Sequence, residues 1–379
     1  MSRLSVQVQA ARAQTDRLFS LLDPAALYDR PVPERHRLIF YLGHVEAFDW
    51  NLLAERALGK SSFHPTFDKL FAFGIDPEPG RAPADRPSDW PREEEVRGYV
   101  ERVRGELDAS LDRAPEQLLH VAVEHRLMHA ETLAYLFHNL AYDKKLGPAP
   151  AVVIAKPVEN VFVDVPAGKA TLGRPRNDGF GWDNEFDLHT VEVPAFRISR
   201  FKITNGEYLE HVRSGAALPH FWVERAGRYF LRAMFGEIPL SLDWPVYVTH
   251  SEASAYARSR GHQLPTEAQF HRAAEGSSPV NAAFERWDPV SATAGESSGV
   301  SQLIGNGWEW TSTVFAPFSG FEPFPFYPGY SADFFDSKHY VMKGASSRTA
   351  ACFLRSSFRN WFRPDYPHVY AGFRLVEGR

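Results

Sequence analysis

The sequence predicts an α+β protein of two domains, a helical bundle in residues 1–150 and a strand- and loop-rich domain in residues 151–379. Three observations lead to this prediction. The first third of the chain has apolar residues at helical spacing, and short alternating strands broken by Gly, Pro and Asn fill the rest. A Pro/Ala-rich segment, "KKLGPAPAVVIAKP" at 144–157, separates the two patterns. A chain of 379 residues is also long for one core, because domains average roughly 150 residues.

Four periodic stretches match the helices of a four-helix bundle, at residues 5–22, 34–58, 93–113 and 116–142. The third stretch has a strongly charged face. Between the second and third lies "HPTFDKLFAFGIDPEPGRAPADRPSDWP" at 64–91. Its prolines predict a crossover connection near one end of the bundle.

The second domain is expected to contain short strands, "VFVDVPAG", "KATLG", "HTVEVPAFRISR" and "YVMKGAS". Two helices are expected, at 204–215 and 251–276, each opened by a Thr or Ser that can cap it. Aromatic residues crowd the Pro- and Gly-rich stretch 315–335, which predicts long ordered loops. No internal repeat is visible.

Composition excludes several function classes. The formal net charge is -5 with both signs interspersed, so neither nucleic acid nor an acidic membrane is an expected partner. The start of the chain lacks the apolar core of a secretory signal, and no segment has 18 apolar residues in a row. Cys352 is the single cysteine, so no intrachain disulfide is possible. These features predict a cytoplasmic location and leave the oligomeric state open.

Two histidines in "VEHRLMHAETLAYL" point to a metal site. His125 and His129 are four residues apart in the fourth predicted helix, 116–142, so both imidazoles lie on one face of that helix. Such a pair is more often two packing histidines, and it needs a third partner. His44 supplies one, because it lies among apolar residues that face the bundle core. Imidazole binds zinc, copper, nickel and iron, so the type of ligand does not identify the metal.

Carboxylates near these histidines have two interpretations. Glu46 and Glu131 either orient the imidazole rings or are solvated charges on the helix surfaces. His64 is a weaker pocket candidate, and the other histidines are expected to be structural.

Six phrases of the second domain resemble the formylglycine-generating-enzyme, or sulfatase-modifying-factor, family, which has a C-type-lectin-like fold. They are "VPAGKATLG", "WDNEFDLHTVEVPAF", "KITNGEYLEHV", "PVYVTHSEASAYARSRGHQLPTEAQFHRAAEG", "GNGWEWTSTVF" and "YAGFRLV". Trp308 and Trp310 within them are expected to be core residues. Those enzymes hold copper with a cysteine pair, and the single cysteine here excludes that activity.

A DinB-like bundle with three histidines before such a domain resembles the ergothioneine-biosynthesis sulfoxide synthases. The HxxxHxE phrase of that family matches His125, His129 and Glu131, and its upstream ligand matches His44. The resemblance implies an Fe(II) enzyme that uses dioxygen to join sulfur to the imidazole C2 of hercynine. It also implies a site between the two domains, a common place for small-molecule pockets.

The resemblance implies substrate-contacting residues in the second domain. Tyr327 and Tyr330 match the family's tyrosine pair, with Tyr327 as donor of a proton or a hydrogen atom; the alternative is that both rings pack a loop. Asn360 matches the residue that bonds the hercynine carboxylate. Trp361 matches the ring that faces its quaternary ammonium, a contact worth about 1–2 kcal/mol when desolvated.

Three positions depart from the family pattern. Phe362 and Tyr366 replace an acid and a base that clamp γ-glutamylcysteine, and Met128 replaces a common glutamine of the hercynine pocket. Without the clamp, an aromatic-lined pocket suits a sugar better than a zwitterion. The chain therefore looks most like the selenoneine-synthase branch, which takes a selenosugar as donor; "FDKLFAFGIDPEPG" supports this interpretation.

Three alternatives remain open at this level. A thiol, cysteine or γ-glutamylcysteine, can replace the selenosugar. A DinB-type thiol transferase would use zinc or nickel without oxygen. A lectin-like binding protein would have no turnover.

Overall fold

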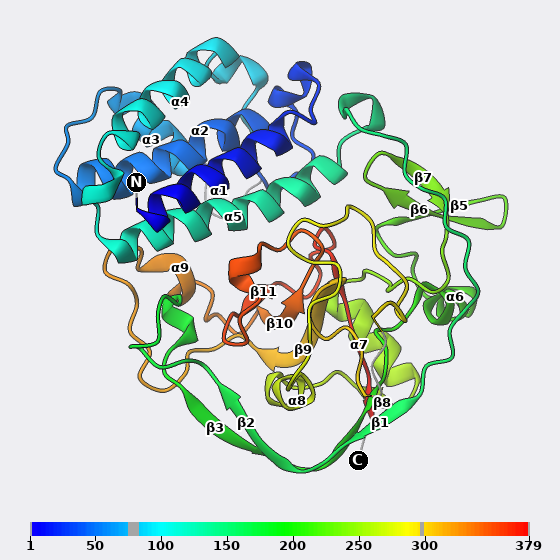
Figure 1. Cartoon of the computed structure of the whole chain (residues 1–379). Helices are drawn as coiled ribbons and strands as arrows, with labels where there is room; N and C mark the ends of the chain where they lie inside the picture. The colour runs from blue at the N-terminus through cyan, green and yellow to red at the C-terminus, as the bar shows by residue number, and fades with distance from the viewer. Residues whose placement is uncertain (1, 75–82, 296–298, 378–379) are drawn as a thin grey trace. The chain divides into compact units, whose positions relative to one another are not determined.

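The structure, a computed structural model, describes residues 2–74, 83–295 and 299–377. It divides into two compact units, residues 1–148 and 149–379. The first unit is helical, and the second combines helices with small sheets (Figure 1). The α+β fold class is therefore confirmed. Residues 75–80 of the phrase "FDKLFAFGIDPEPG" lie outside the described residues.

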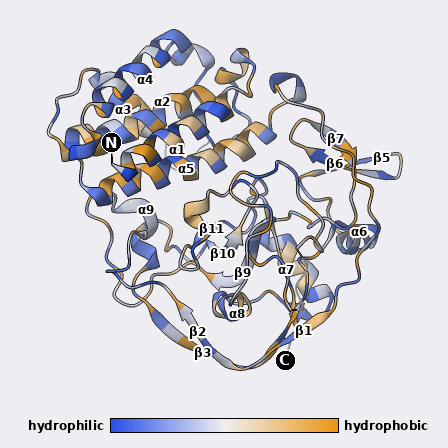
Figure 2. Ribbon diagram, viewed as in Figure 1, coloured by the Kyte–Doolittle hydropathy of each residue, from blue (hydrophilic) through white to orange (hydrophobic). Residues whose placement is uncertain are grey.

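The long helices of the first unit are α1 (Arg3–Phe19), α2 (Leu38–Asp49), α3 (Pro65–Phe73), α4 (Glu93–Asp108) and α5 (Glu116–His138). A π-helical segment, Trp50–Ala57, continues α2. α1 packs on α5, and α2 packs on α3, α4 and α5. Figure 2 shows hydrophobic residues along α1, α2 and α5 and a largely hydrophilic α4. Helix α2 therefore lies at the centre of this unit's packing.

Helix α3 corrects the prediction that 64–91 is only a crossover connection. His64 begins this helix, since its Nδ1 accepts a hydrogen bond from the Phe67 amide at 3.2 Å. Pro65 occupies the first turn, where its missing amide hydrogen costs nothing. Gly74, with φ of +77°, follows the last residue of the helix. The prolines of this segment thus start a helix as well as interrupting one.

The described residues of the second unit form four small sheets. One has the order β1 (Phe162–Val165), β4 (Phe196–Ser199), β13 (Val376–Glu377) and β8 (His262–Gln263). A second has the order β11 (Asn360–Phe362), β10 (Tyr340–Ala345), β9 (Gly307–Val314) and β12 (Ala371–Gly372), with β12 parallel to β9. The other two are β2 (Gly168–Leu172) with β3 (His189–Val193), and β5 (Trp222–Arg225) with β6 (Arg228–Ala233) and β7 (Gly236–Pro239).

The helices of the second unit are α6 (Asn205–Arg213), α7 (His250–Ser259), α8 (Glu267–Ala273) and the short α9 (Gly329–Ala332). Thr204 caps α6, as expected. The single helix predicted at 251–276 is wrong. Thr249 caps α7 and Thr266 caps α8, with Gly261 at φ of +72° and strand β8 between them. A left-handed glycine cannot continue an α-helix, and this one turns the chain into the sheet.

Residues of the phrases "GNGWEWTSTVF" and "YAGFRLV" lie in the core of this unit. Trp308 and Trp310 are buried, which confirms their predicted structural role. Between them, Glu309 accepts hydrogen bonds from Lys202 at 2.6 Å and from Arg374 at 3.0 Å, and all three side chains are fully buried. The "GWEW" and "GFR" phrases are thus tied together by one buried charge network.

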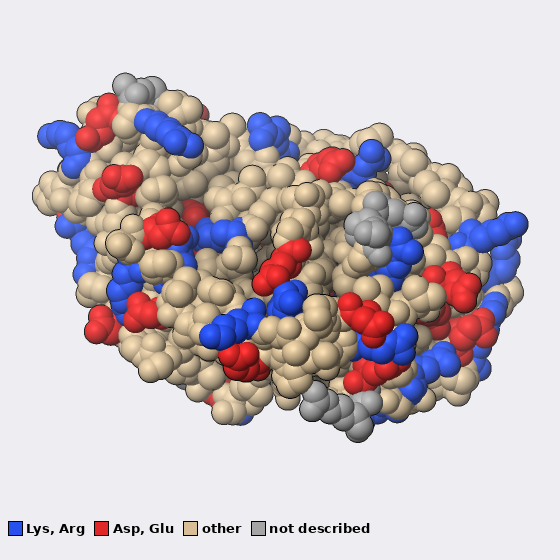
Figure 3. Space-filling model, turned by 60° about the horizontal axis from the view of Figure 1, so that its bottom comes forward, with Lys and Arg blue, Asp and Glu red and all other residues tan. Residues whose placement is uncertain are grey.

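Surface properties follow the composition. The face drawn in Figure 3 shows positive and negative side chains interspersed. Among the described helices, none is both long and apolar enough for a membrane span.

Candidate metal centre

Three histidines converge in the first unit. His44 from α2 and His125 and His129 from α5 each bring one ring nitrogen to within 4.8 Å of the others. The Nε2 atoms of His44 and His129 are 3.2 Å apart. Within the described ranges this is the one cluster of three or more His, Cys, Asp or Glu side chains with such spacing. The structure therefore brings together the three predicted ligands.

Helix α3 and two phenylalanines fix the rings. Nδ1 of His44 donates to the Phe71 carbonyl at 2.6 Å, so its Nε2 directs a lone pair at the other histidines. Phe48 stacks on His125 with centroids 3.4 Å apart, and Phe40 stacks on His44 at 4.7 Å. These contacts hold both imidazoles before any ligand binds.

Burial keeps the histidines neutral. Desolvation lowers the pKa of His44 to about 4. It also lowers the pKa of His125 and of His129 well below the usual value, and the neighbouring rings of the cluster add to this effect. A metal binds neutral imidazole, so all three side chains are in the binding form at pH 7.

A divalent ion fits this donor set. Nε2 of His44 and Nε2 of His129 face each other across 3.2 Å, and neutral imidazole nitrogens are the form that binds a metal ion. Metal–nitrogen bonds are about 2.1 Å long, so three nitrogens this close need only small ring movements to share one ion. Three histidine ligands also leave coordination positions for small molecules.

A cluster of buried, charged side chains includes residues next to the histidines in sequence. Glu46 is fully buried and accepts hydrogen bonds from Arg126 at 2.8 Å and from Arg104 at 2.7 Å. Arg126 also donates to Asp49 at 2.6 Å. Both interpretations of Glu46 are wrong, because it is neither solvated nor bonded to an imidazole: it holds arginines. Glu131 is half-buried.

Sequence reasoning missed two supports of the site, the Phe71 carbonyl and the Arg126 cluster, and it missed the π-helical segment that follows α2. π-Helical turns are rare and often occur at functional sites. The apolar spacing of "FDKLFAF" was a usable signal for α3, whereas a backbone acceptor leaves no signal in sequence.

The second unit gathers a separate aromatic cluster. Tyr330 is buried and stacks on Trp182, with centroids 4.0 Å apart, and its ring meets Trp361 edge-on at 5.5 Å. Tyr327 lies 5.5 Å from Tyr330, and burial and Asp333 raise its pKa. The structure therefore brings Tyr327, Tyr330 and Trp361 together.

Four other residues were predicted to contact substrate: Asn360, Phe362 and Tyr366 in the second unit and Met128 in the first. Asn360 Oδ1 accepts from the Trp361 amide at 2.9 Å. Phe362 and Tyr366 stack at 5.0 Å with an interplanar angle of 14°. Met128 is half-buried on α5 of the first unit.

Comparison with known proteins matches both halves of the chain. Residues 7–140 match the DinB superfamily, and residues 153–281 and 277–379 match the sulfatase-modifying factor enzyme 1-like domain. The solved PvdO from Pseudomonas aeruginosa aligns with 57% of this chain and 94% of its own, at 20% identity and a TM-score of 0.40.

Two curated relatives combine both domains of this chain within their alignments. Ergothioneine biosynthesis protein 1 of Schizosaccharomyces pombe is 29% identical over 94% of this chain and 54% of its own length. The chain thus spans about half the length of the fungal relatives it matches. Hercynine oxygenase of Mycolicibacterium thermoresistibile is 30% identical over 99% of this chain and 94% of its own.

The fold and the histidine cluster define a two-domain protein with a DinB-type bundle and a sulfatase-modifying-factor-like domain. The near full-length match places it more narrowly: the chain belongs to the hercynine oxygenase family.

Proposed function

We propose that this protein is an oxygen-dependent iron enzyme that bonds a chalcogen to the imidazole C2 of hercynine. The observation that carries the proposal is the cluster of a buried His125 with half-buried His44 and His129 in a chain aligned along its length with proteins named hercynine oxygenase. Bound to these imidazoles, ferrous iron would supply the activation of dioxygen.

The aromatic cluster of the second unit is proposed to serve hercynine. Because Asn360 Oδ1 accepts from the backbone, its amide hydrogens are directed away from that bond and can donate to a carboxylate. Trp361 is half-buried and stacks on Phe315 at 4.2 Å, and its ring is proposed to face the quaternary ammonium.

Tyr327 is proposed as the donor of a proton or hydrogen atom. Its raised pKa keeps the phenol protonated at neutral pH, the form that can donate. Tyr330 is proposed to hold this region, since its ring is stacked on Trp182.

For the chalcogen donor we propose a selenosugar. The two positions where a charged clamp is expected hold Phe362 and Tyr366, which stack on each other as an uncharged aromatic surface. Such a surface binds the apolar face of a sugar and offers one hydroxyl, but no charge for a zwitterion. Met128 is proposed to shape the hercynine side of the pocket. The second candidate is an ergothioneine-type enzyme, and two relatives have the name ergothioneine biosynthesis protein 1. Its donor would be cysteine or γ-glutamylcysteine.

Anaerobic reconstitution tests both candidates. The full chain is loaded with Fe(II), then given hercynine, oxygen and one of three donors: selenosugar, γ-glutamylcysteine or cysteine. Mass spectrometry is expected to show a carbon–selenium product with the selenosugar. Product with γ-glutamylcysteine alone overturns the selenium proposal, and thiol transfer with zinc or nickel in the absence of oxygen overturns the oxidative reaction.

Metal content provides the matching control. His129→Ala is expected to abolish iron binding. His120→Ala, the same change on the same helix but outside the cluster, is expected to keep it. Equal iron content in wild type and His129→Ala would show that the site is elsewhere.

A further inference from the structure

Residues 182–185, which we call the WDNE segment, are all buried although three of the four are polar. Asp183, Asn184 and Glu185 expose 1%, 1% and 0% of their surfaces and form a single 3-10 helical turn between β2 and β3. Polar side chains are costly to bury unless they are hydrogen-bonded. The partners of these three side chains therefore indicate what the segment holds in place.

The first two polar residues of the WDNE segment hold residues 327–331, which we call the tyrosine group. Ser331 Oγ donates to the Asp183 carboxylate and accepts from Asn184 Nδ2 at 2.9 Å. The Ser331 side chain is fully buried, so water does not replace these bonds. The Tyr330 amide donates to the Tyr327 carbonyl at 3.2 Å. Contacts made at Ser331 thus fix the short turn that carries both tyrosines.

The last residue of the WDNE segment holds residues 355–361, which we call the RNW group. Glu185 accepts hydrogen bonds from Arg355 at 2.6 and 2.8 Å and from Ser357 Oγ at 2.6 Å. Burial opposes ionisation of Glu185, but Arg355 and Ser357 outweigh it and lower its pKa. The Asn184 carbonyl also accepts from Arg359 at 3.4 Å. An ionised, buried carboxylate therefore fixes the residues that lead into β11.

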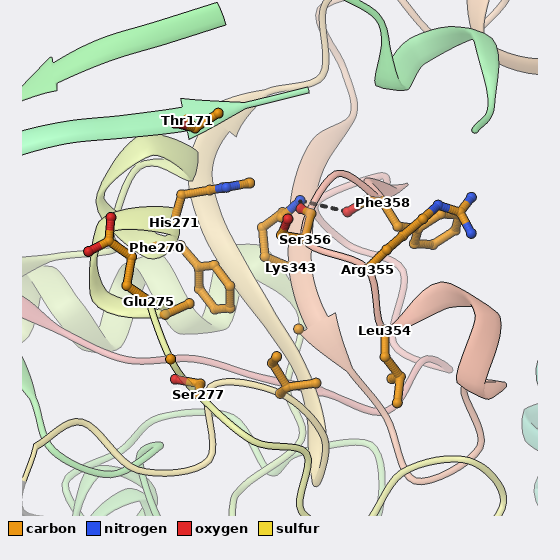
Figure 4. A pocket seen from close by; sticks show the side chains of 14 residues that line it. Thr171, Phe270, His271, Glu275, Ser277, Lys343, Leu354, Arg355, Ser356 and Phe358 are labelled. Carbon is orange, nitrogen blue, oxygen red and sulfur yellow. Dashed lines mark hydrogen bonds between the residues drawn. The ribbon is translucent and has the colours of Figure 1, made fainter. Parts of the chain in front are cut away.

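The RNW group has a second attachment, to β10. Lys343 Nζ donates to the carbonyls of Ser356 at 2.8 Å and Phe358 at 2.6 Å (Figure 4). The same view shows the Arg355 side chain extending away from Lys343. Main-chain groups of the RNW group thus bind β10, while its side chains bind Glu185. Loss of a bond to Glu185 is therefore expected to shift this group without detaching it.

The tyrosine group and the RNW group meet at their aromatic rings. Tyr330 and Trp361 meet edge-on with centroids 5.5 Å apart, and Trp182 of the WDNE segment stacks on Tyr330 at 4.0 Å. The WDNE segment therefore contacts both groups and sets how their rings approach each other. Such supports matter for a reaction, because a displacement of about 1 Å can lower a rate about 100-fold.

We propose that the WDNE segment positions the tyrosine group and the RNW group relative to each other for the reaction with hercynine. Asp183 and Asn184 position the tyrosine group, and Glu185 positions the RNW group. They are positioning residues, since none of them is assigned to contact with metal or substrate. This inference rests on the proposed function, which gives the two groups separate tasks: proton or hydrogen-atom donation and hercynine binding.

Hydrogen exchange of the full chain, measured by mass spectrometry, tests the contacts without any reaction. Ser331→Ala removes the hydroxyl bonded to Asp183, and Ser357→Ala removes one bonded to Glu185. Ser199→Ala, at another buried and hydrogen-bonded serine of this unit, is the matched control. Each of the first two variants is expected to speed exchange about tenfold in its own group only. Equal changes in both groups, or none, overturn the separate control of the two groups.

Steady-state kinetics of the iron-loaded chain separates positioning from stability. Ser331→Ala is expected to lower kcat about fivefold or more with an unchanged KM for hercynine, and Ser357→Ala to raise this KM about fivefold with an unchanged kcat. Glu185→Gln, which also removes the charge that binds Arg355, is expected to raise KM further.

The control separates the two ways in which the kinetic test can fail. Ser199→Ala is expected to change neither kcat nor KM. If the other variants, folded at the assay temperature, behave like Ser199→Ala in an active wild-type background, the positioning role is wrong. A wild-type chain without turnover contradicts the proposed function instead.

Discussion

Arg126 and Glu46 form an ion pair, 2.8 Å between nitrogen and oxygen, in which 1% and 0% of the side chains are exposed. The pair joins α5 to α2 at positions adjacent to His125 and two residues from His44. Burial opposes ionisation of Glu46, but Arg126 and Arg104 outweigh it and lower its pKa to about 2. The two helices that carry the histidines are therefore held in register by buried charge.

Removal of this arginine is expected to be severe. Arg126→Met leaves Glu46 and Asp49 buried without their main cation, which typically costs about 3–5 kcal/mol. Urea unfolding of the metal-free chain measures this loss of free energy. Arg97→Met is the control, because the exposed Arg97–Glu93 pair on α4 is expected to contribute less than about 0.5 kcal/mol. Similar losses in the two variants would contradict the structural role of the buried pair.

Gly43 is expected to be irreplaceable at the contact between α2 and α3. A Cβ on Gly43 would lie 2.4 Å from the ring of Phe71, which is fully buried. Gly43→Ala must therefore displace the residue whose carbonyl holds His44. We expect lower stability, by about 1–3 kcal/mol as for overpacked cores, and weaker metal binding, measured by unfolding and by metal titration.

Gly98 provides the matched control on α4. A Cβ there meets nothing within 4 Å, and the residue is exposed. Gly98→Ala is expected to stabilise the chain by about 0.5–1 kcal/mol through helix propensity alone, with metal binding unchanged. If Gly43→Ala behaved in the same way, the close packing of Phe71 on α2 would be wrong.

These residues also show what the sequence could predict. The spacing of His125 and His129 is local to one helix, and the apolar neighbours of His44 indicate its burial, so the cluster was predictable. The Phe71 carbonyl was not, because every residue has one and only the packing of α3 on α2 selects it. In the sequence, charged residues such as Arg126, Glu46 and Asp49 look like solvated residues on helix surfaces. Their burial follows only from the packing of α2 against α5.

The same limit applies in the second unit. Alternating apolar residues predicted its strands, and the family phrases predicted its buried tryptophans, since both signals are contiguous in sequence. The break between α7 and α8 depends on Gly261 and on the pairing of β8 with β13, a partner more than 100 residues away. Periodicity within a short window does not detect such a partner.

Acid is expected to destabilise the metal-free chain before carboxylates titrate. Histidines of the unfolded chain have a pKa of about 6.5, whereas burial lowers that of folded His44 to about 4 and those of His125 and His129 well below the usual value. Between these values the unfolded state binds more protons, so the free energy of unfolding falls as pH falls.

The magnitude can be measured per histidine. Each is expected to contribute about 1.4 kcal/mol per pH unit below pH 6.5, seen by urea unfolding at pH 7.0, 6.0 and 5.5. His125→Leu removes one titrating group and is expected to reduce the slope by about that amount. An unchanged slope would mean that the pKa of this imidazole is the same in the folded and the unfolded chain.

The two tyrosines of the aromatic cluster are expected to differ, given the proposed function. Tyr327→Phe keeps the ring and removes the hydroxyl, so a lost proton donor is expected to lower kcat by about 100-fold or more while KM for hercynine stays within about twofold. Tyr330→Phe keeps the stacking on Trp182 and is expected to retain kcat within about threefold. Steady-state oxygen consumption with product analysis measures both variants. An equal fall in kcat would assign the two hydroxyls a shared role, and a fall confined to Tyr330→Phe would transfer the donor role to that residue.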